Sequence, residues 1–272
     1  MRTIRLLLPV LFVFILPLVA GCDDGATSEK SAEETGTPPQ TIVLTCYIGE
    51  NMVHPMHAIK EAYEKLHPEI RVECYDSGTT TLEKTIRNTR SGDIFLPGSN
   101  SYTDKMKEEG LVTWDSPVCK HILAVIVLKD SGINEWEDLL KPSVKIGRGN
   151  ENVCSVGRLA KKVVERAGLP ELEANVEILS VVNFQSSSFR SLVDGRVAAL
   201  LNWRNMSVCP EDIRDRMKII DIPEEINIIK TIPVAVLVFS KNPQEANLFA
   251  RYVAGPEGKR FFRQYGFVTT TD

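Results

Sequence analysis

The feature that most constrains the fold is an alternation of strand-like and helix-like segments through residues 41–272. β-branched apolar runs, such as 41–46 (TIVLTC), are followed by stretches with apolar residues at helical spacing, such as 55–66 (PMHAIKEAYEKL). Strands alternating with helices over this length predict an α/β fold with parallel sheets built from βαβ units. The pattern predicts strands at 41–46, 70–75, 93–96, 122–128, 144–146, 176–179, 198–201 and 232–239, and helices at 55–66, 81–90, 102–109, 157–167, 189–193, 243–254 and 257–265.

Two fully apolar runs, 122–128 (ILAVIVL) and 232–239 (IPVAVLVF), bracket an inner α/β segment. This arrangement predicts two lobes joined by a hinge, with the second lobe inserted in the first. We expect the run at 122–128 to cross from one lobe to the other. The predicted lobes are 41–121 plus 232–272 for lobe 1, and 122–231 for lobe 2. A single α/β sheet is the alternative.

The N-terminus has the features of an export signal. Arg2 and Arg5 precede an apolar run at 6–18, and small residues stand before Cys22. The run is too short and too interrupted by proline to span a membrane comfortably. Val19-Ala20-Gly21-Cys22 resembles the bacterial lipobox, in which the cysteine is acylated and becomes the new N-terminus. We therefore predict a signal peptide at 1–21 and lipidation at Cys22. An ordinary signal peptide and an uncleaved anchor are the alternatives.

Residues 22–40 are polar, acidic and free of aromatic side chains, so they predict a flexible tether. We expect the protein to be exported and held by lipid alone on the outer face of the cytoplasmic membrane, which is the periplasmic side in a Gram-negative cell. Loss of the signal lowers the formal net charge from −4 to −6. A chain this acidic, without a basic stripe, is not expected to bind nucleic acid.

The cysteines of the body are odd in number and widely spaced, which excludes a zinc knuckle and a disulfide scaffold. One disulfide is compatible with an oxidising compartment, and the sequence leaves its pairing open. The cysteines are Cys46, Cys74, Cys119, Cys154 and Cys209.

Three stretches place small or hydroxyl residues just ahead of a predicted helix: 77–81 (SGTTT), 154–157 (CSVG) and 185–188 (QSSS). A helix N-terminus offers unpaired N–H groups and the positive end of the dipole, so it binds anions. Any one stretch is explained by ordinary N-capping. Three of them favour an anion site, because the ends of parallel strands and the starts of the following helices converge on one cleft.

Several longer segments resemble the periplasmic molybdate-binding protein family. Those at 50–72, 75–86 and 92–112 resemble its first lobe, and 232–267, with SKNP, GPEGK and a terminal YGF, resembles its closing segment. The resemblance implies a type II solute-binding fold that closes on a small oxyanion such as molybdate or tungstate. It also implies permease subunits of an ABC importer as partners, a monomer, and no cofactor. A sensory module with the same fold is the alternative.

The resemblance also implies a set of ligand-binding positions. The family's serine falls at 77–79, and its backbone donors fall near 155–156 and 185–186. Asn202 stands where the family has a tyrosine, and Gly49-Glu50 stand where it has a serine. The full set is Gly49, Glu50, Ser77, Gly78, Thr79, Ser155, Val156, Gln185, Ser186, Asn202, Trp203 and Arg204.

Glu50 matters because a desolvated carboxylate near a dianion costs several kcal/mol. Either Glu50 points away from the ligand, or it is protonated, or the ligand is not a simple dianion. Arg204 is a candidate to offset the cost, since a guanidinium binds oxyanions in a bidentate manner, and a surface ion pair is the alternative for Arg204. Trp203 is expected to form a lobe wall, with stacking on a ligand as the alternative.

Glu50, His54 and His57 form an alternative candidate site. Their helical spacing and their side chains suit a transition metal, although Pro55 interrupts the helix start. In this alternative, the ligand is a metal ion or a small organic anion. The chain has no G-x-S-x-G, H-E-x-x-H or P-loop pattern, so we do not expect an enzyme.

Overall fold

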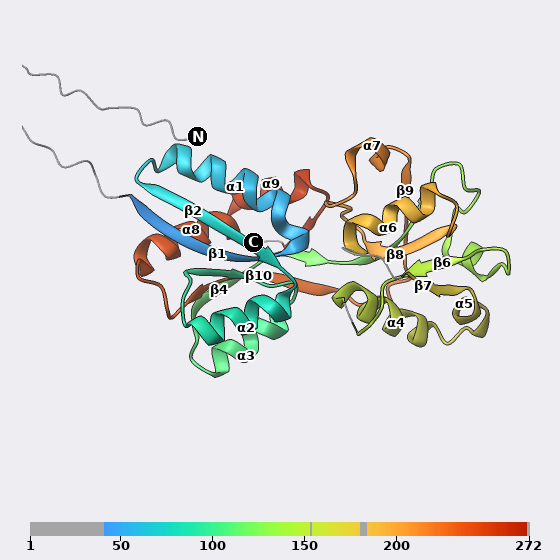
Figure 1. Ribbon diagram of the computed structural model, residues 1–272, viewed down its shortest axis with the longest axis horizontal. Helices are drawn as coiled ribbons and strands as arrows, with labels where there is room; N and C mark the ends of the chain where they lie inside the picture. Colours follow the sequence, from blue (N-terminus) through green and yellow to red (C-terminus); the bar gives the residue numbers. More distant parts are fainter. Residues whose placement is uncertain (1–40, 153, 180–183, 271–272) are drawn as a thin grey trace, which may run out of the picture. The chain divides into compact units, whose positions relative to one another are not determined.

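The computed structural model describes residues 41–152, 154–179 and 184–270. The predicted signal peptide, Cys22 and the predicted tether lie outside the described residues. The described chain forms two mixed β-sheets with helices packed on them (Figure 1). Within these ranges, no helix is long and apolar enough to cross a membrane.

The first sheet has six strands in the order β11-β4-β10-β3-β1-β2. β1 runs parallel to β2 and β3, whereas β10 is antiparallel to β3 and β4, and β11 is antiparallel to β4. We call this sheet, together with the helices on it, lobe 1. Its strands are β1 (Ile42–Gly49), β2 (Ile70–Ser77), β3 (Ile94–Leu96), β4 (Val112–His121), β10 (Lys230–Leu237) and β11 (Val268–Thr269).

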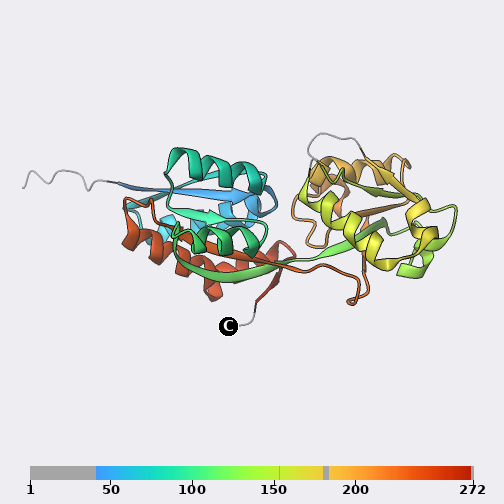
Figure 2. The same ribbon diagram turned by 90° about the horizontal axis from the view of Figure 1, so that it is seen from below.

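Helices cover both faces of the first sheet (Figure 2). On α1, the buried residues Met56, Ile59 and Tyr63 recur at spacings of three and four, and Tyr63 packs edge-on against Phe249 of α8. One face therefore carries a single apolar core, formed with α1 (Val53–Leu66), α8 (Pro243–Ala254) and α9 (Pro256–Gln264). The other face carries α2 (Thr79–Thr89) and α3 (Asn100–Glu108), and the short 3₁₀ helix η1 (Glu50–Met52) precedes α1.

The second sheet has five strands in the order β7-β6-β8-β5-β9, and with its helices it forms lobe 2. β6 is parallel to β7 and β8, whereas β5 is antiparallel to β8 and β9. The strands are β5 (Leu123–Leu128), β6 (Ile146–Arg148), β7 (Val176–Ile178), β8 (Ala199–Trp203) and β9 (Met217–Asp221). The helices are η2 (Trp136–Leu140), α4 (Ser155–Ala167), α5 (Pro170–Ala174), α6 (Phe184–Val193) and α7 (Glu211–Arg214).

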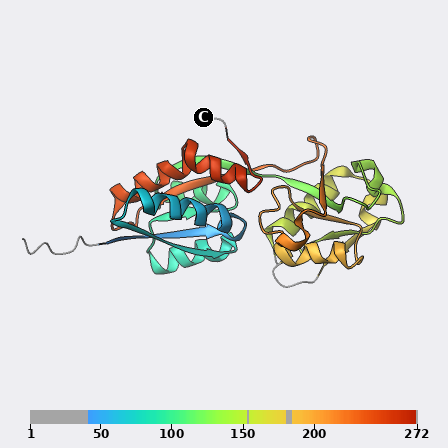
Figure 3. The same ribbon diagram turned by 90° about the horizontal axis from the view of Figure 1, so that it is seen from above.

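The chain passes between the lobes twice (Figure 3). It leaves lobe 1 at Ile122, between β4 and β5, and returns through 222–229, between β9 and β10. At the return, Lys230 lies opposite His121 in the β4–β10 ladder. The two-lobe α/β fold, with the second lobe inserted in the first and a hinge between them, is therefore confirmed.

Two of the sequence predictions about the sheets are wrong. The run at 122–128 does not cross between the lobes, because β5 lies wholly in the second sheet and pairs with β8 and β9. Neither sheet is purely parallel. A chain that leaves a lobe and returns to it brings its outgoing and incoming strands together in opposite directions, as β4 and β10 show. β4 was missed because its sequence, VTWDSPVCKH, mixes polar residues and a proline with the apolar ones.

Candidate ligand-binding site

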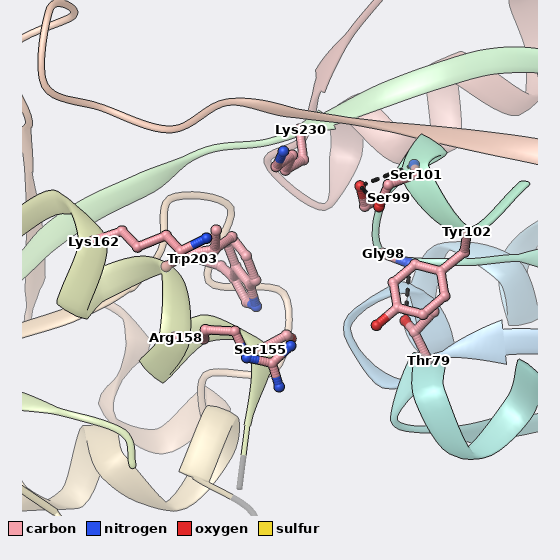
Figure 4. A pocket seen from close by; sticks show the side chains of 11 residues that line it. Thr79, Gly98, Ser99, Ser101, Tyr102, Ser155, Arg158, Lys162, Trp203 and Lys230 are labelled. Atoms are coloured by element: carbon pink, nitrogen blue, oxygen red, sulfur yellow. Dashed lines mark hydrogen bonds between the residues drawn. The ribbon is translucent and has the colours of Figure 1, made fainter. Parts of the chain in front are cut away.

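A cavity of about 230 Å³ lies between the lobes (Figure 4). Lobe 1 and lobe 2 each contribute one wall, and the start of β10 contributes Lys230. The lining residues are Thr79, Gly98, Ser99, Ser101, Tyr102, Ser155, Arg158, Leu159, Lys162, Trp203 and Lys230.

The lobe 1 wall is built where parallel strands end and helices begin. Thr79 opens α2 just after β2, and Ser99 is the N-cap of α3 just after β3. The Thr79 hydroxyl accepts a hydrogen bond from the Gly98 N–H at 3.0 Å, and the Ser99 hydroxyl accepts one from the Ser101 N–H at 3.3 Å. The starts of two helices are thus held side by side at the cavity, and the first N–H groups of a helix have no partner within it.

The lobe 2 wall is one face of α4 together with an indole ring. Ser155, Arg158 and Lys162 lie along one face of α4 because their spacings of three and four are helical. The start of α4 packs tightly on the loop after β6, since a Cβ on Gly157 would come within 2.5 Å of the Gly149 backbone. Glycine at 157 therefore fixes the position of this helix start at the cavity.

The cavity is electropositive, although the whole chain carries a formal charge of −4. Arg158, Lys162 and Lys230 line it, and no carboxylate is among the lining residues. The Arg158 Nε lies 3.4 Å from a backbone oxygen, that of Glu151. Among the described residues, none of these three cations is within ion-pair distance of a carboxylate. Their charge is therefore available to an anion.

His121 contacts residues of both walls. Its ring stacks on the Trp203 indole with centroids 4.2 Å apart, and its Nδ1 lies 2.9 Å from the Gly98 carbonyl oxygen. With Nδ1–H as the donor, Nε2 accepts from the Asn51 side-chain amide at 3.0 Å. Burial lowers the pKa of His121 to about 4, against an opposing effect of the Gly98 hydrogen bond. The neutral ring thus links the start of α3 in lobe 1 to β8 in lobe 2.

Of the predicted ligand positions, Thr79, Ser155 and Trp203 line the cavity. The Trp203 indole forms part of the wall, and its Nε1 donates to Gln185 Oε1 at 3.1 Å. The remaining predicted positions of these stretches do not line it: Gly49 at the end of β1, Ser77 and Gly78 between β2 and α2, the buried Val156 on α4, and Gln185 and Ser186 in the first turn of α6.

Glu50 also lies outside the lining of this cavity. Glu50 Oε2 accepts a hydrogen bond from Gln185 Nε2 at 3.3 Å, and this bond joins the two lobes. Burial, and then the negative charge of Asp76, raises the pKa of Glu50.

Asn202 and Arg204 have partners within the protein. The buried Asn202 amide donates to the Gln185 carbonyl and the Ser188 hydroxyl, and it accepts from the Trp203 N–H at 2.7 Å. Arg204 forms an ion pair with Asp221, with Nε and Oδ1 2.7 Å apart, and does not line the cavity. The ion pair of Arg204 with Asp221 is the alternative that the sequence left open for this residue.

The residues of the metal alternative, Glu50, His54 and His57, are not gathered into a metal-binding group in the part of the chain that the structure describes. His54 and His57 are exposed on α1, and His54 stacks on Tyr265 with ring centroids 6.0 Å apart. Residues 41–152, 154–179 and 184–270 contain no group of three or more His, Cys, Asp or Glu that could hold a metal ion.

Several cavity residues were not identified from the sequence. The sequence PGSNS at 97–101 repeats the pattern of small and hydroxyl residues before a helix. This pattern could have identified Gly98, Ser99 and Ser101 as cavity residues. The shared helix face of Arg158 and Lys162 was a weaker signal, and nothing local to Tyr102 or Lys230 marks either as a cavity residue.

Two α/β lobes joined by two crossings, with a cavity between them lined by three cations, are the features of a solute-binding protein of the type II periplasmic class. The chain belongs to the family of bacterial extracellular solute-binding proteins, whose sequence model matches residues 44–268. The family is one of bacterial extracellular proteins that bind solutes.

Individual relatives agree with this assignment. A Haemophilus influenzae protein described as a binding protein is 25% identical over 232 residues, which cover 84% of this chain and 92% of the relative. A substrate-binding domain from Clostridium difficile, assigned to a molybdenum ABC transporter, superposes with a TM-score of 0.74 at 20% identity, covering 85% of this chain and 100% of that chain.

Two further solved structures share the fold. The periplasmic molybdate-binding protein of Azotobacter vinelandii has a TM-score of 0.67 at 12% identity, covering 84% of this chain and 100% of that chain. PEB3 of Campylobacter jejuni, solved with bound L-phospholactate, has a TM-score of 0.64 at 15% identity, covering 83% and 99%.

Proposed function

We propose that this protein captures a small oxyanion in the cavity between its lobes and delivers it to the permease of an ABC importer. The observation that carries the proposal is the electropositive cavity, which Arg158, Lys162 and Lys230 line without any carboxylate. The helix starts at Thr79, Ser99 and Ser155 add N–H and hydroxyl donors to the same space.

The ligands named with proteins of the same fold support the same class of ligand, a small oxyanion. Molybdate and L-phospholactate both carry a tetrahedral oxyanion, and both are named with proteins that share this fold. Oxygen atoms around one centre suit donors that converge from several helix starts, as they do here.

Closure of the lobes explains how binding is coupled to delivery. Lobe 1 and lobe 2 each hold part of the donor set, so the full set forms only when the lobes approach each other. A ligand that contacts both walls stabilises the closed form by its differential affinity for that form. The closed form is then the signal that the permease recognises.

Calorimetric titration with molybdate, tungstate, sulfate and phosphate tests the oxyanion claim. Arg158→Gln is expected to weaken binding about tenfold or more, because a hydrogen bond to a charged group contributes about 1.5–3 kcal/mol. Arg204→Gln is the matched control, since Arg204 pairs with Asp221 away from the cavity, and we expect little change. Equal losses in the two variants would contradict the assignment of the site.

We also propose that the protein is acylated at Cys22 and tethered to the membrane through residues 22–40. The support is the Val-Ala-Gly-Cys sequence after an export signal. Tethering the binding domain to the membrane that holds the permease raises the effective concentration of the domain at the permease. Mass spectrometry of the N-terminal peptide should show a lipid on Cys22. Cys22→Ser should move the protein from the membrane fraction to the soluble fraction, and an unlipidated Cys22 in the exported wild-type protein would disprove the anchor.

A further inference from the structure

We propose that the ligand is a phosphorylated short-chain organic acid, in which a tetrahedral oxyanion and a second anionic group sit on one small carbon skeleton. This inference rests on the proposed function and specifies its substrate class. Two features of the cavity carry it: the number of its cations and the apolar part of its lining.

The cations exceed what a bare dianion can neutralise. Arg158 and Lys162 approach the cavity from α4, and Lys230 approaches from the return crossing (Figure 4). When the lobes close, each cation loses water, and a desolvated cation without an anion is strongly unfavourable. A phosphate monoester with a carboxylate supplies about three negative charges, so it leaves none of the three cations unpaired.

The walls also offer apolar surface that a bare oxyanion cannot use. The Trp203 indole, the Leu159 side chain and the Tyr102 ring line the same cavity as the cations. A molybdate or sulfate ion presents only oxygen atoms to its surroundings, whereas a short carbon skeleton packs on such rings and gains from their burial.

The lining of the cavity suits the two anionic groups of such a ligand. The hydroxyls and helix starts, together with Arg158, suit the tetrahedral group, and Lys162 suits the second anionic group.

The test compares matched ligands by calorimetry on the purified full chain. The phospho-acids are 3-phosphoglycerate and phosphoenolpyruvate. Glycerol 3-phosphate has the phosphate without the carboxylate, glycerate has the carboxylate without the phosphate, and molybdate, sulfate and inorganic phosphate are the bare ions. We expect a phospho-acid to bind at least about tenfold more tightly than glycerol 3-phosphate and than every bare ion.

A bare ion that binds as tightly as the phospho-acids would overturn this inference and leave the proposed function intact. Absence of binding by every anion tested would overturn both. Lys162→Gln should weaken phospho-acid binding about tenfold and should weaken bare-ion binding by a smaller factor. Lys161→Gln is its matched control, because Lys161 is the neighbouring lysine of α4 and pairs with Glu165 outside the cavity. Equal effects of the two substitutions would contradict the role of Lys162.

A second inference concerns the cysteines and is independent of the ligand. Cys46 and Cys74 are directly opposite each other in the parallel ladder between β1 and β2, so their side chains leave the same face of the sheet. Neighbouring strands lie about 4.8 Å apart, within the Cα separation of about 4.4–6.8 Å that disulfides span. We infer that Cys46 and Cys74 form an inter-strand disulfide in the exported protein.

The surroundings of the two thiols suit this reaction. Both residues belong to the core beneath α1, where Cys46 is fully buried and Cys74 is half-buried. A hydrogen bond from the Cys46 thiol lowers the pKa of Cys74. The Cys74 thiolate attacks the disulfide of an extracytoplasmic protein oxidant, and Cys46 displaces the oxidant from the mixed disulfide. Two electrons and two protons pass to the oxidant, which leaves as its dithiol.

Peptide mapping of exported protein, alkylated at lysis and kept unreduced, tests the pairing. We expect linked peptides that contain Cys46 and Cys74, with Cys209 alkylated. Cys74→Ser should abolish the link, and Cys209→Ser, the matched control, should leave it unchanged. Alkylation of both Cys46 and Cys74 in the exported wild-type protein, or a link from either to another cysteine, would overturn the inference.

Discussion

At the scale of single residues, His121 shows how a buried side chain joins the two walls of the site. Its partners are uncharged: the Gly98 carbonyl, the Asn51 amide and the Trp203 ring. A protonated ring would carry hydrogens on both nitrogens, so Nε2 could no longer accept from Asn51. Neutrality of His121 is therefore part of what holds α3 and β8 in place.

This arrangement predicts a pH dependence of stability. The folded pKa of His121 is about 4, against an ordinary value of 6.5. The unfolded chain therefore binds the proton more readily, and stability is lost as the pH falls from 6.5 towards 4. The expected loss between pH 7 and pH 4.5 is about 2 kcal/mol in the free energy of unfolding. Denaturant unfolding at pH 7 and pH 4.5 measures it.

Comparison of variants isolates the contribution of His121. His121→Gln should show a smaller decrease in unfolding free energy between the two pH values than the wild type. His57→Gln, on the exposed face of α1, should retain the wild-type decrease. The same pH dependence in wild type and His121→Gln would contradict the prediction.

At the scale of elements, two glycines near helix starts differ in the space available for a side chain. A Cβ on Gly157 would lie 2.5 Å from the Gly149 backbone, whereas a Cβ on Gly78 would meet nothing within 4 Å. We expect Gly157→Ala to cost about 1–3 kcal/mol, because the start of α4 must shift away from the loop after β6. Since Ser155 and Arg158 shift with it, anion binding should also weaken.

Gly78→Ala is the matched control for this prediction. Its backbone, with φ −60° and ψ 134°, is open to any residue, so the change should stay within about 0.5 kcal/mol. Thermal unfolding and anion titration of both variants measure the effects. Equal stability of the Gly157→Ala and Gly78→Ala proteins would contradict the prediction, because the close approach of residue 157 to the Gly149 backbone would then be relieved without loss of stability.

At the scale of the whole molecule, the lobes are connected by more than the two crossings. The Ser207 hydroxyl of lobe 2 donates to the Asn51 carbonyl oxygen of lobe 1 at 2.8 Å, and Gln185 donates to Glu50 at 3.3 Å. We expect the radius of gyration, measured by X-ray scattering, to fall when a ligand binds both walls. Arg158→Gln should require a higher ligand concentration for the same decrease, and a radius unchanged at saturation would exclude closure.

The sequence by itself determined the local elements and the general class of the protein. Periodicity located most helices closely, including α8 at Pro243–Ala254. It located most core strands because apolar side chains must alternate or cluster wherever a sheet is covered. Hydroxyl residues before helices pointed to an anion site, and Thr79 and Ser155 do line the cavity.

The tertiary structure alone decided which of these residues meet. The cavity brings together Arg158 and Lys162 from α4 with Lys230 from the start of β10. Arg204 instead pairs with Asp221, and the Asn202 amide is hydrogen-bonded within lobe 2. The antiparallel pairing of β4 with β10 joins segments more than a hundred residues apart. Such contacts depend on how the two crossings bring distant segments together, and no local pattern of residues encodes that.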